Sequence, residues 1–190
     1  MKNIFIRDIE KCKICKEYLP LKPKPVFQFK KGAKILIIGQ APGRVTHNSG
    51  VPWDDKSGER LREWLGVTDE EFYNPSLFAL VPMAFCYPGT GKSGDLPPRP
   101  ECAETWMGPI RTYLSNIKLE IYIGKYSCDF HFEKYKNLTA LIKNQAKSKD
   151  DRIVLPHPSP RNNIWLAKNS WFAKTTLSEL QKRVRKELKK

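Results

Sequence analysis

Residues 35–43 read ILIIGQAPG, an apolar run that ends in a turn rich in glycine and proline. Near the other end of the chain, the apolar run IVL at 153–155 precedes the sequence HPSPRN at 157–162. Short β-branched runs closed by turn residues are typical of strands buried in a parallel sheet. Loops at the carboxyl ends of such strands are where open α/β sheets bind ligands. The two motifs therefore predict one site assembled from distant parts of the chain.

Strands and helices are expected to alternate along the chain. Strands are predicted at 34–38, 77–85, 119–124 and 152–156, and helices at 57–65, 101–115, 138–147 and 171–190. Ser57 is predicted to cap the first helix and Gly66 to end it. The proline-rich part of residues 1–33 is expected to be extended. Alternation of this kind predicts an α/β fold, a three-layer αβα sandwich with a central four-stranded parallel sheet, in one domain over 1–190.

The chain is strongly basic. Lysine and arginine total 34 against 20 acidic residues, which gives a formal net charge of +14. Such an excess attracts polyanions, and nucleic acid is the commonest partner. No apolar run reaches the roughly 20 residues that span a bilayer, and the first residues lack the apolar stretch of a signal peptide. We therefore expect a cytoplasmic protein that acts as a monomer, contacts DNA and does not contact a membrane.

Five cysteines are present, and four of them form a pattern. Cys12 and Cys15 are separated by two residues, a spacing that lets both thiolates reach one metal centre. Cys86 and Cys102 complete a possible four-thiolate site, while Cys128 is expected to be a packed side chain. A zinc ion, an iron–sulfur cluster and four unrelated buried thiols are the alternatives that the spacing leaves open.

These motifs together resemble the uracil-DNA glycosylase superfamily. GQAPG and HPSPRN are similar to its first and second signature motifs, and the cysteine pattern is similar to its iron–sulfur branch, usually called family 4. The resemblance extends from about Cys12 to Asn162. It implies a [4Fe-4S] cluster on the four patterned cysteines, with zinc as the alternative. It also implies a DNA repair hydrolase that removes uracil or a related deaminated base without lyase chemistry.

The resemblance also assigns roles to residues. His157 would donate a hydrogen bond to the pyrimidine oxygen as negative charge develops there. Trp53 would stack on the flipped base, and the loop after His157 would contact the DNA strand. The residues that would bind the substrate are Gly39, Gln40, Ala41, Pro42, Gly43, His47, Trp53, Ser159, Arg161 and Asn162.

Three positions depart from the family pattern. Gln40 stands where family 4 members usually carry Glu, and Ala41 stands where family 1 members carry Asp. We therefore expect Asp55 or Asp54 to position the attacking water or stabilise the sugar cation. Pro82 replaces the Asn that reads uracil in family 4, with His47 and Asn48 as possible substitutes. The preferred base is accordingly open between uracil and other deaminated or damaged bases.

Two other interpretations compete with a glycosylase. One is a non-catalytic nucleic-acid-binding protein that keeps the fold and has lost the acid of the first motif. The other is a zinc-stapled domain that acts on free nucleosides, which would not need a basic surface. Residues 88–93, PGTGKS, also look like the end of a phosphate-binding loop. The prolines that follow at 97, 98 and 100 forbid the helix that such a loop requires.

Overall fold

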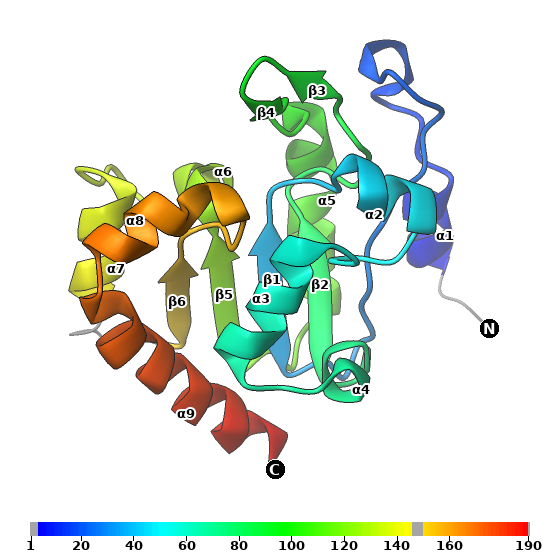
Figure 1. The fold of residues 1–190 in the computed structure, drawn as a ribbon. Coiled ribbons are helices and arrows are strands. Elements are labelled where there is room, and N and C mark those ends of the chain that lie inside the picture. Colours follow the sequence, from blue (N-terminus) through cyan, green and yellow to red (C-terminus); the bar gives the residue numbers. More distant parts are fainter. Residues whose placement is uncertain (1–3, 146–149, 190) are drawn as a thin grey trace.

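The computed structural model describes residues 4–145 and 150–189, and its centre is a four-stranded sheet (Figure 1). The strand order is β2-β1-β5-β6, and every pairing is parallel. The strands are β1 (Ile35–Gly39), β2 (Phe78–Pro82), β5 (Leu119–Ile123) and β6 (Arg152–Leu155). The expected central sheet is confirmed, and the carboxyl ends of its strands meet at one edge.

Strand β1 forms the middle of the sheet because both of its faces are covered. All five of its residues are buried, and Ile35 pairs with Phe78 on one side and Leu119 on the other. A continuous apolar run is the pattern that a parallel strand covered on both faces requires. The ILII run therefore fixes this strand in the core and places the following GQAPG turn at the carboxyl edge.

Helices cover both faces of the sheet. They are α1 (Ile4–Glu10), α2 (Arg44–Ser49), α3 (Lys56–Leu65), α4 (Asp69–Phe72), α5 (Pro100–Tyr113), α6 (Gly124–His131), α7 (Leu138–Gln145), α8 (Asn163–Lys168) and α9 (Ser178–Leu188). Figure 1 shows α3 and α9 in front of the sheet and α5 behind it, which confirms the αβα arrangement. On the front layer Trp64 of α3 packs edge-to-face against Phe172, with ring centroids 5.2 Å apart.

Several predicted boundaries are corrected by the structure. Asp55, not Ser57, caps α3, because the Asp55 carboxylate accepts the Gly58 amide. Helices α1, α2, α4, α6 and α8 were not predicted, and α1 precedes the proline-rich stretch that was expected to be extended. Residues 146–147 and 190 of two predicted helices lie outside the described residues.

The loop after β2 contains a small hairpin that the sequence did not predict. Strands β3 (Thr90–Gly91) and β4 (Gly94–Asp95) pair antiparallel, with Thr90 opposite Asp95. Ser93 leads into β4 and not into a helix, so the PGTGKS segment lacks the helix of a phosphate-binding loop, as its prolines indicated. The hairpin lies near the carboxyl edge of the sheet (Figure 1).

Candidate active site

A cavity of about 510 Å³ opens at the carboxyl ends of β1, β2 and β6. Residues of both signature motifs line it, although the motifs lie more than 100 residues apart in sequence. The predicted site residues that line it are Gly39, Gln40, Ala41, Pro42, Gly43, Trp53, Asp55, His157, Ser159, Arg161 and Asn162. The location is the one at which open α/β sheets bind ligands.

Two predicted residues do not line this cavity. His47 lies on α2, where its ring faces Tyr87 at a centroid distance of 6.1 Å. Among the described residues, nothing hydrogen-bonds its buried Nδ1 atom. Asp54 is exposed, while its neighbour Asp55 faces the cavity. The structure thus separates the two acidic residues that the sequence left equivalent.

The sequence prediction missed several residues of the cavity, and Ser93, Asp95 and Tyr126 are among those with polar side chains. Tyr126 follows β5 by three residues, so the rule that drew attention to the ends of β1 and β6 would also have indicated it. Asp95 had no such signal, because the hairpin that carries it is too short to read from sequence.

His157 is held in a defined orientation by its own loop. Its Nδ1 accepts the backbone amide of Ser159 at 3.2 Å, and Asn162 donates from Nδ2 to the His157 carbonyl at 2.6 Å. Burial lowers the pKa of His157, and the charge of Asp55 opposes this effect in part. The neutral ring therefore carries its proton on Nε2, since Nδ1 is the acceptor. The cavity gains a neutral N–H donor.

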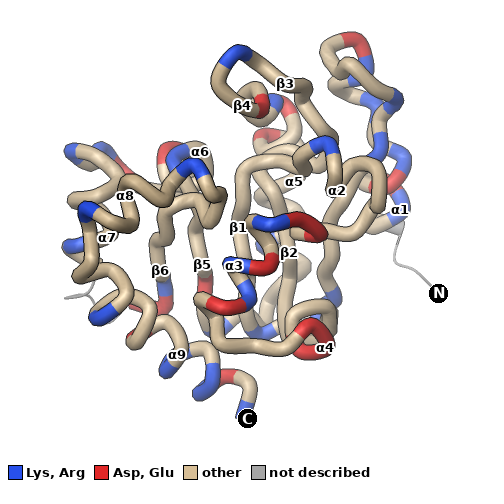
Figure 2. The backbone as a smooth tube through the Cα atoms, viewed as in Figure 1, with Lys and Arg blue, Asp and Glu red and all other residues tan. Residues whose placement is uncertain are grey.

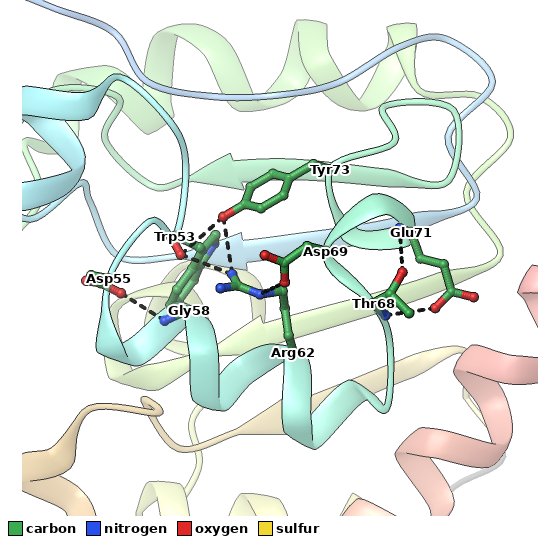
Figure 3. Close-up of polar contacts among 8 residues, drawn as sticks. All are labelled: Trp53, Asp55, Gly58, Arg62, Thr68, Asp69, Glu71 and Tyr73. Atoms are coloured by element: carbon green, nitrogen blue, oxygen red, sulfur yellow. Dashed lines mark hydrogen bonds and ion pairs between the residues drawn. The ribbon is translucent and has the colours of Figure 1, made fainter.

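The backbone of Trp53 adopts an unfavourable conformation, which hydrogen bonds from neighbouring side chains stabilise. Its φ angle is +59°, and it is the single described residue other than glycine with positive φ. Figure 3 shows the Trp53 carbonyl accepting hydrogen bonds from Arg62 Nη1 at 3.3 Å and from the Tyr73 hydroxyl at 3.4 Å. Arg62 is fixed in turn by an ion pair with Asp69, 2.7 Å between Nε and Oδ1. Strain of this kind is characteristic of functional sites.

Two glycines allow the Trp53 segment to fit. A Cβ at Gly58 would lie 1.7 Å from the Trp53 carbonyl oxygen, and one at Gly39 would lie 2.8 Å from the indole ring. The indole therefore lies directly against the first motif. Its ring centroid is 5.7 Å from that of His157, so the two rings form adjacent walls of the cavity.

Asp55 caps a helix and also lines the cavity. Its Oδ1 accepts the Gly58 amide at 2.8 Å and so caps α3 (Figure 3). A carboxylate at a helix N-terminus is stabilised by the helix dipole. The same side chain lines the cavity and acts electrostatically on His157. Asp55 therefore holds the start of α3 and at the same time faces any ligand that fills the cavity.

A second, smaller cavity is lined by the four patterned cysteines. It has a volume of about 20 Å³, and Cys12, Cys15, Cys86 and Cys102 all face it. Burial, with a smaller contribution from the neighbouring thiols, raises the pKa of Cys86 to about 11 and of Cys102 to about 12. Within the described residues, no three His, Cys, Asp or Glu side chains are arranged to hold a single metal ion. Cys128 is buried on α6, away from this cavity.

Positive charge gathers near the carboxyl edge of the sheet, the edge at which the larger cavity opens. Figure 2 shows basic segments on α2, at the turn between β3 and β4 and on α6, all near the carboxyl edge of the sheet. They include Arg44, Lys92 and Lys125. A cluster of this kind favours the approach of a polyanion to the cavity.

The fold and the cavity define an α/β protein with a histidine- and tryptophan-lined pocket at the carboxyl edge of its sheet. The model of the uracil DNA glycosylase superfamily matches residues 26–181. The chain belongs to this superfamily, whose members act on DNA. Among the described residues, no helix is long and apolar enough to cross a membrane.

Proposed function

We propose that this protein is a monofunctional DNA glycosylase that hydrolyses the N-glycosidic bond of uracil or a related deaminated base. The observation that carries the proposal is the single cavity in which His157, Trp53 and Asp55 face one another. A glycosylase must take the base out of the helix and hold it in such a pocket. Superfamily membership supports the same reaction class.

Each of these side chains supplies one requirement of the reaction. The Nε2 proton of His157 stabilises the negative charge that grows on a pyrimidine oxygen as the base departs. The Trp53 ring offers a stacking surface, which contributes about 1–3 kcal/mol per base. The Asp55 carboxylate positions the attacking water or stabilises the cationic sugar. Together they account for base binding, departure and hydrolysis.

The specificity of the site depends on Pro82, which ends β2 and lines the cavity. Proline has no amide donor and no side-chain hydrogen bond, so it cannot read a base edge as Asn does. The superfamily makes uracil the first substrate to test. Other deaminated bases fit the same reaction because they also leave as anions.

The first test is excision from labelled oligonucleotides that contain uracil, hypoxanthine, xanthine or a thymine mismatch, in single and double strands. Cleavage of any of these bases supports the proposal. Tight binding to DNA without excision across the whole set would contradict it and favour a non-catalytic DNA-binding protein instead.

Asp55 is best tested with Asp55→Asn. Asparagine is as good a helix cap as aspartate, so this variant removes the charge and retains the bond to Gly58. Asp54→Asn is the matched comparison, because it removes the same charge one residue away from an exposed position. We expect Asp55→Asn to slow excision far more than Asp54→Asn. The opposite ranking would contradict the assignment.

We also propose that the four cysteines hold a [4Fe-4S] cluster, with zinc as the alternative. The donor set fits, since four thiols line one cavity and none of them forms a disulfide. The group would join the segment before β1 to the start of α5. Anaerobic purification followed by metal analysis tests this: a brown protein containing iron supports the cluster, and a colourless protein containing zinc supports the alternative. A protein with neither metal contradicts both.

The remaining proposals concern the state of the protein. We propose a monomer that acts in the cytoplasm, because a base-flipping pocket formed within one chain needs no second copy. Light scattering in solution tests the first point. A stable dimer at low micromolar concentration would contradict it.

A further inference from the structure

The β3–β4 hairpin connects the two signature motifs. Arg161 of the second motif donates from Nη1 to the Ser93 carbonyl at 2.8 Å. Gln40 of the first motif donates from Nε2 to the Leu96 carbonyl at 3.4 Å. The hairpin therefore lies across the cavity, anchored to both loops. A side chain on the face of the hairpin that lines the cavity can therefore contact a bound substrate.

Asp95 is the charged side chain of the hairpin that reaches the cavity. It lines the cavity, and its Oδ2 would lie 3.3 Å from a Cβ at Gly43. Its carboxylate thus approaches the backbone of the first motif from the hairpin side. Arg161 attracts this charge and Asp55 repels it, so the carboxylate lies within electrostatic reach of both. Asp95 is nevertheless exposed, which places it near the mouth of the cavity.

A carboxylate at this mouth opposes the binding of DNA. The protein carries a net charge of +14, yet Asp95 places an acidic side chain on the exposed part of the cavity wall. A group that weakens binding of the ground state accelerates a reaction only if it binds the transition state better. In glycoside cleavage the sugar becomes oxocarbenium-like, and a carboxylate stabilises that positive charge.

We propose that Asp95 is a catalytic carboxylate that replaces the acid missing from the first motif, an inference that rests on the proposed glycosylase function. The C1′–N bond breaks and its electron pair leaves with the base. Asp95 stabilises the cationic sugar from the mouth side, while Asp55 holds the water whose oxygen bonds to C1′. The proton lost by that water balances the proton gained by the base anion.

The test compares Asp95→Asn with Asp8→Asn, which removes an exposed charge from α1, outside the cavity. Single-turnover excision at saturating enzyme measures the chemical step, and a duplex with a tetrahydrofuran abasic site measures binding. We expect Asp95→Asn to slow excision about 100-fold. Its affinity for the abasic duplex should be equal or higher, because a repulsive charge is gone. Asp8→Asn should match the wild type in both measurements.

The outcomes separate this inference from the proposed function. An active wild type whose Asp95→Asn variant excises within about twofold of it would overturn the inference alone. A slower variant whose affinity weakens by the same factor would also overturn it and indicate a structural role of the hairpin. Asp95→Glu provides a second variant: it keeps the charge and should retain more activity than Asp95→Asn, and the reverse ranking would overturn the inference. A wild type inactive on every substrate would refute the proposed function itself.

Discussion

The two cavities lie on either side of the same stretch of backbone. Pro82 lines the larger cavity, whereas Ala84, Phe85 and Cys86 line the cysteine cavity. The larger one, about 510 Å³, gathers His157 and carboxylates, and the smaller one, about 20 Å³, is lined by thiols and mostly apolar side chains. One segment thus separates a large polar cavity from a small thiol-lined cavity, for which we propose an exchanging ligand and a permanently bound group respectively. Variants should therefore affect chemistry in one cavity and stability in the other.

The largest expected effect comes from His157→Ala, which removes the N–H donor of the larger cavity. Loss of one preorganised donor to a developing anion costs about 100- to 1,000-fold in rate. We expect a loss of this size in single-turnover excision. The thermal midpoint should change little, because the ring lines an open cavity and is not part of the hydrophobic core. A large drop in the midpoint would show that His157 supports the fold, and the contrast between the cavities would fail.

The converse variant is Cys86→Ala in the smaller cavity. A cross-link between distant segments typically contributes about 2–5 kcal/mol. Loss of one ligand should therefore lower the thermal midpoint by roughly 4 °C or more. Cys128→Ala is the matched control, since it also removes a buried thiol, but one outside the cavity. Equal shifts for the two variants would indicate that the four cysteines hold no group.

Gly58→Ala is expected to lower both the stability of the fold and the affinity for the base. The added Cβ would lie 1.7 Å from the Trp53 carbonyl oxygen, so the α3 start or the Trp53 segment must move. Overpacking of this kind costs about 1–3 kcal/mol, and the displaced indole should weaken base binding as well. Gly108→Ala on α5 is the control, because nothing lies within 4 Å of its added Cβ. It should be neutral or slightly stabilising. Equal stability of the two variants would contradict the prediction.

The smallest expected effect is a dependence on pH. Burial lowers the pKa of all three histidines, His47, His131 and His157, from the ordinary value of 6.5. The unfolded chain therefore takes up protons at a higher pH than the folded one. The free energy of unfolding should fall as the pH drops from 7 through 6.5 and below. Urea unfolding at several pH values measures this. Histidine NMR titrations that show folded pKa values above 6.5 would contradict it.

Local sequence was enough to predict the sheet, because each strand is marked by its own composition. The ILII run is apolar on both faces, and Gly66 ends α3 with a left-handed φ of +65°. Ser57 was wrongly expected to cap that helix, since two good caps, Ser57 and Asp55, lie close together. Only the fold decides which carboxyl or hydroxyl reaches the free amide. The hairpin was missed because two strands of two residues carry no periodic pattern.

The sequence by itself determined where the four strands lie along the chain, the two motifs and the four cysteines, since these depend on residue type and short spacing. It also determined the basic charge. The tertiary structure alone decided that Asp55 and not Asp54 faces the cavity, that His47 lies outside it and that Asp95 lies within it. The physical reason is that a side chain's direction at the end of a strand depends on contacts made by residues far away in sequence. Trp53 is the clearest case: Arg62, Tyr73 and Gly58 together hold its backbone in a conformation that its own side chain disfavours.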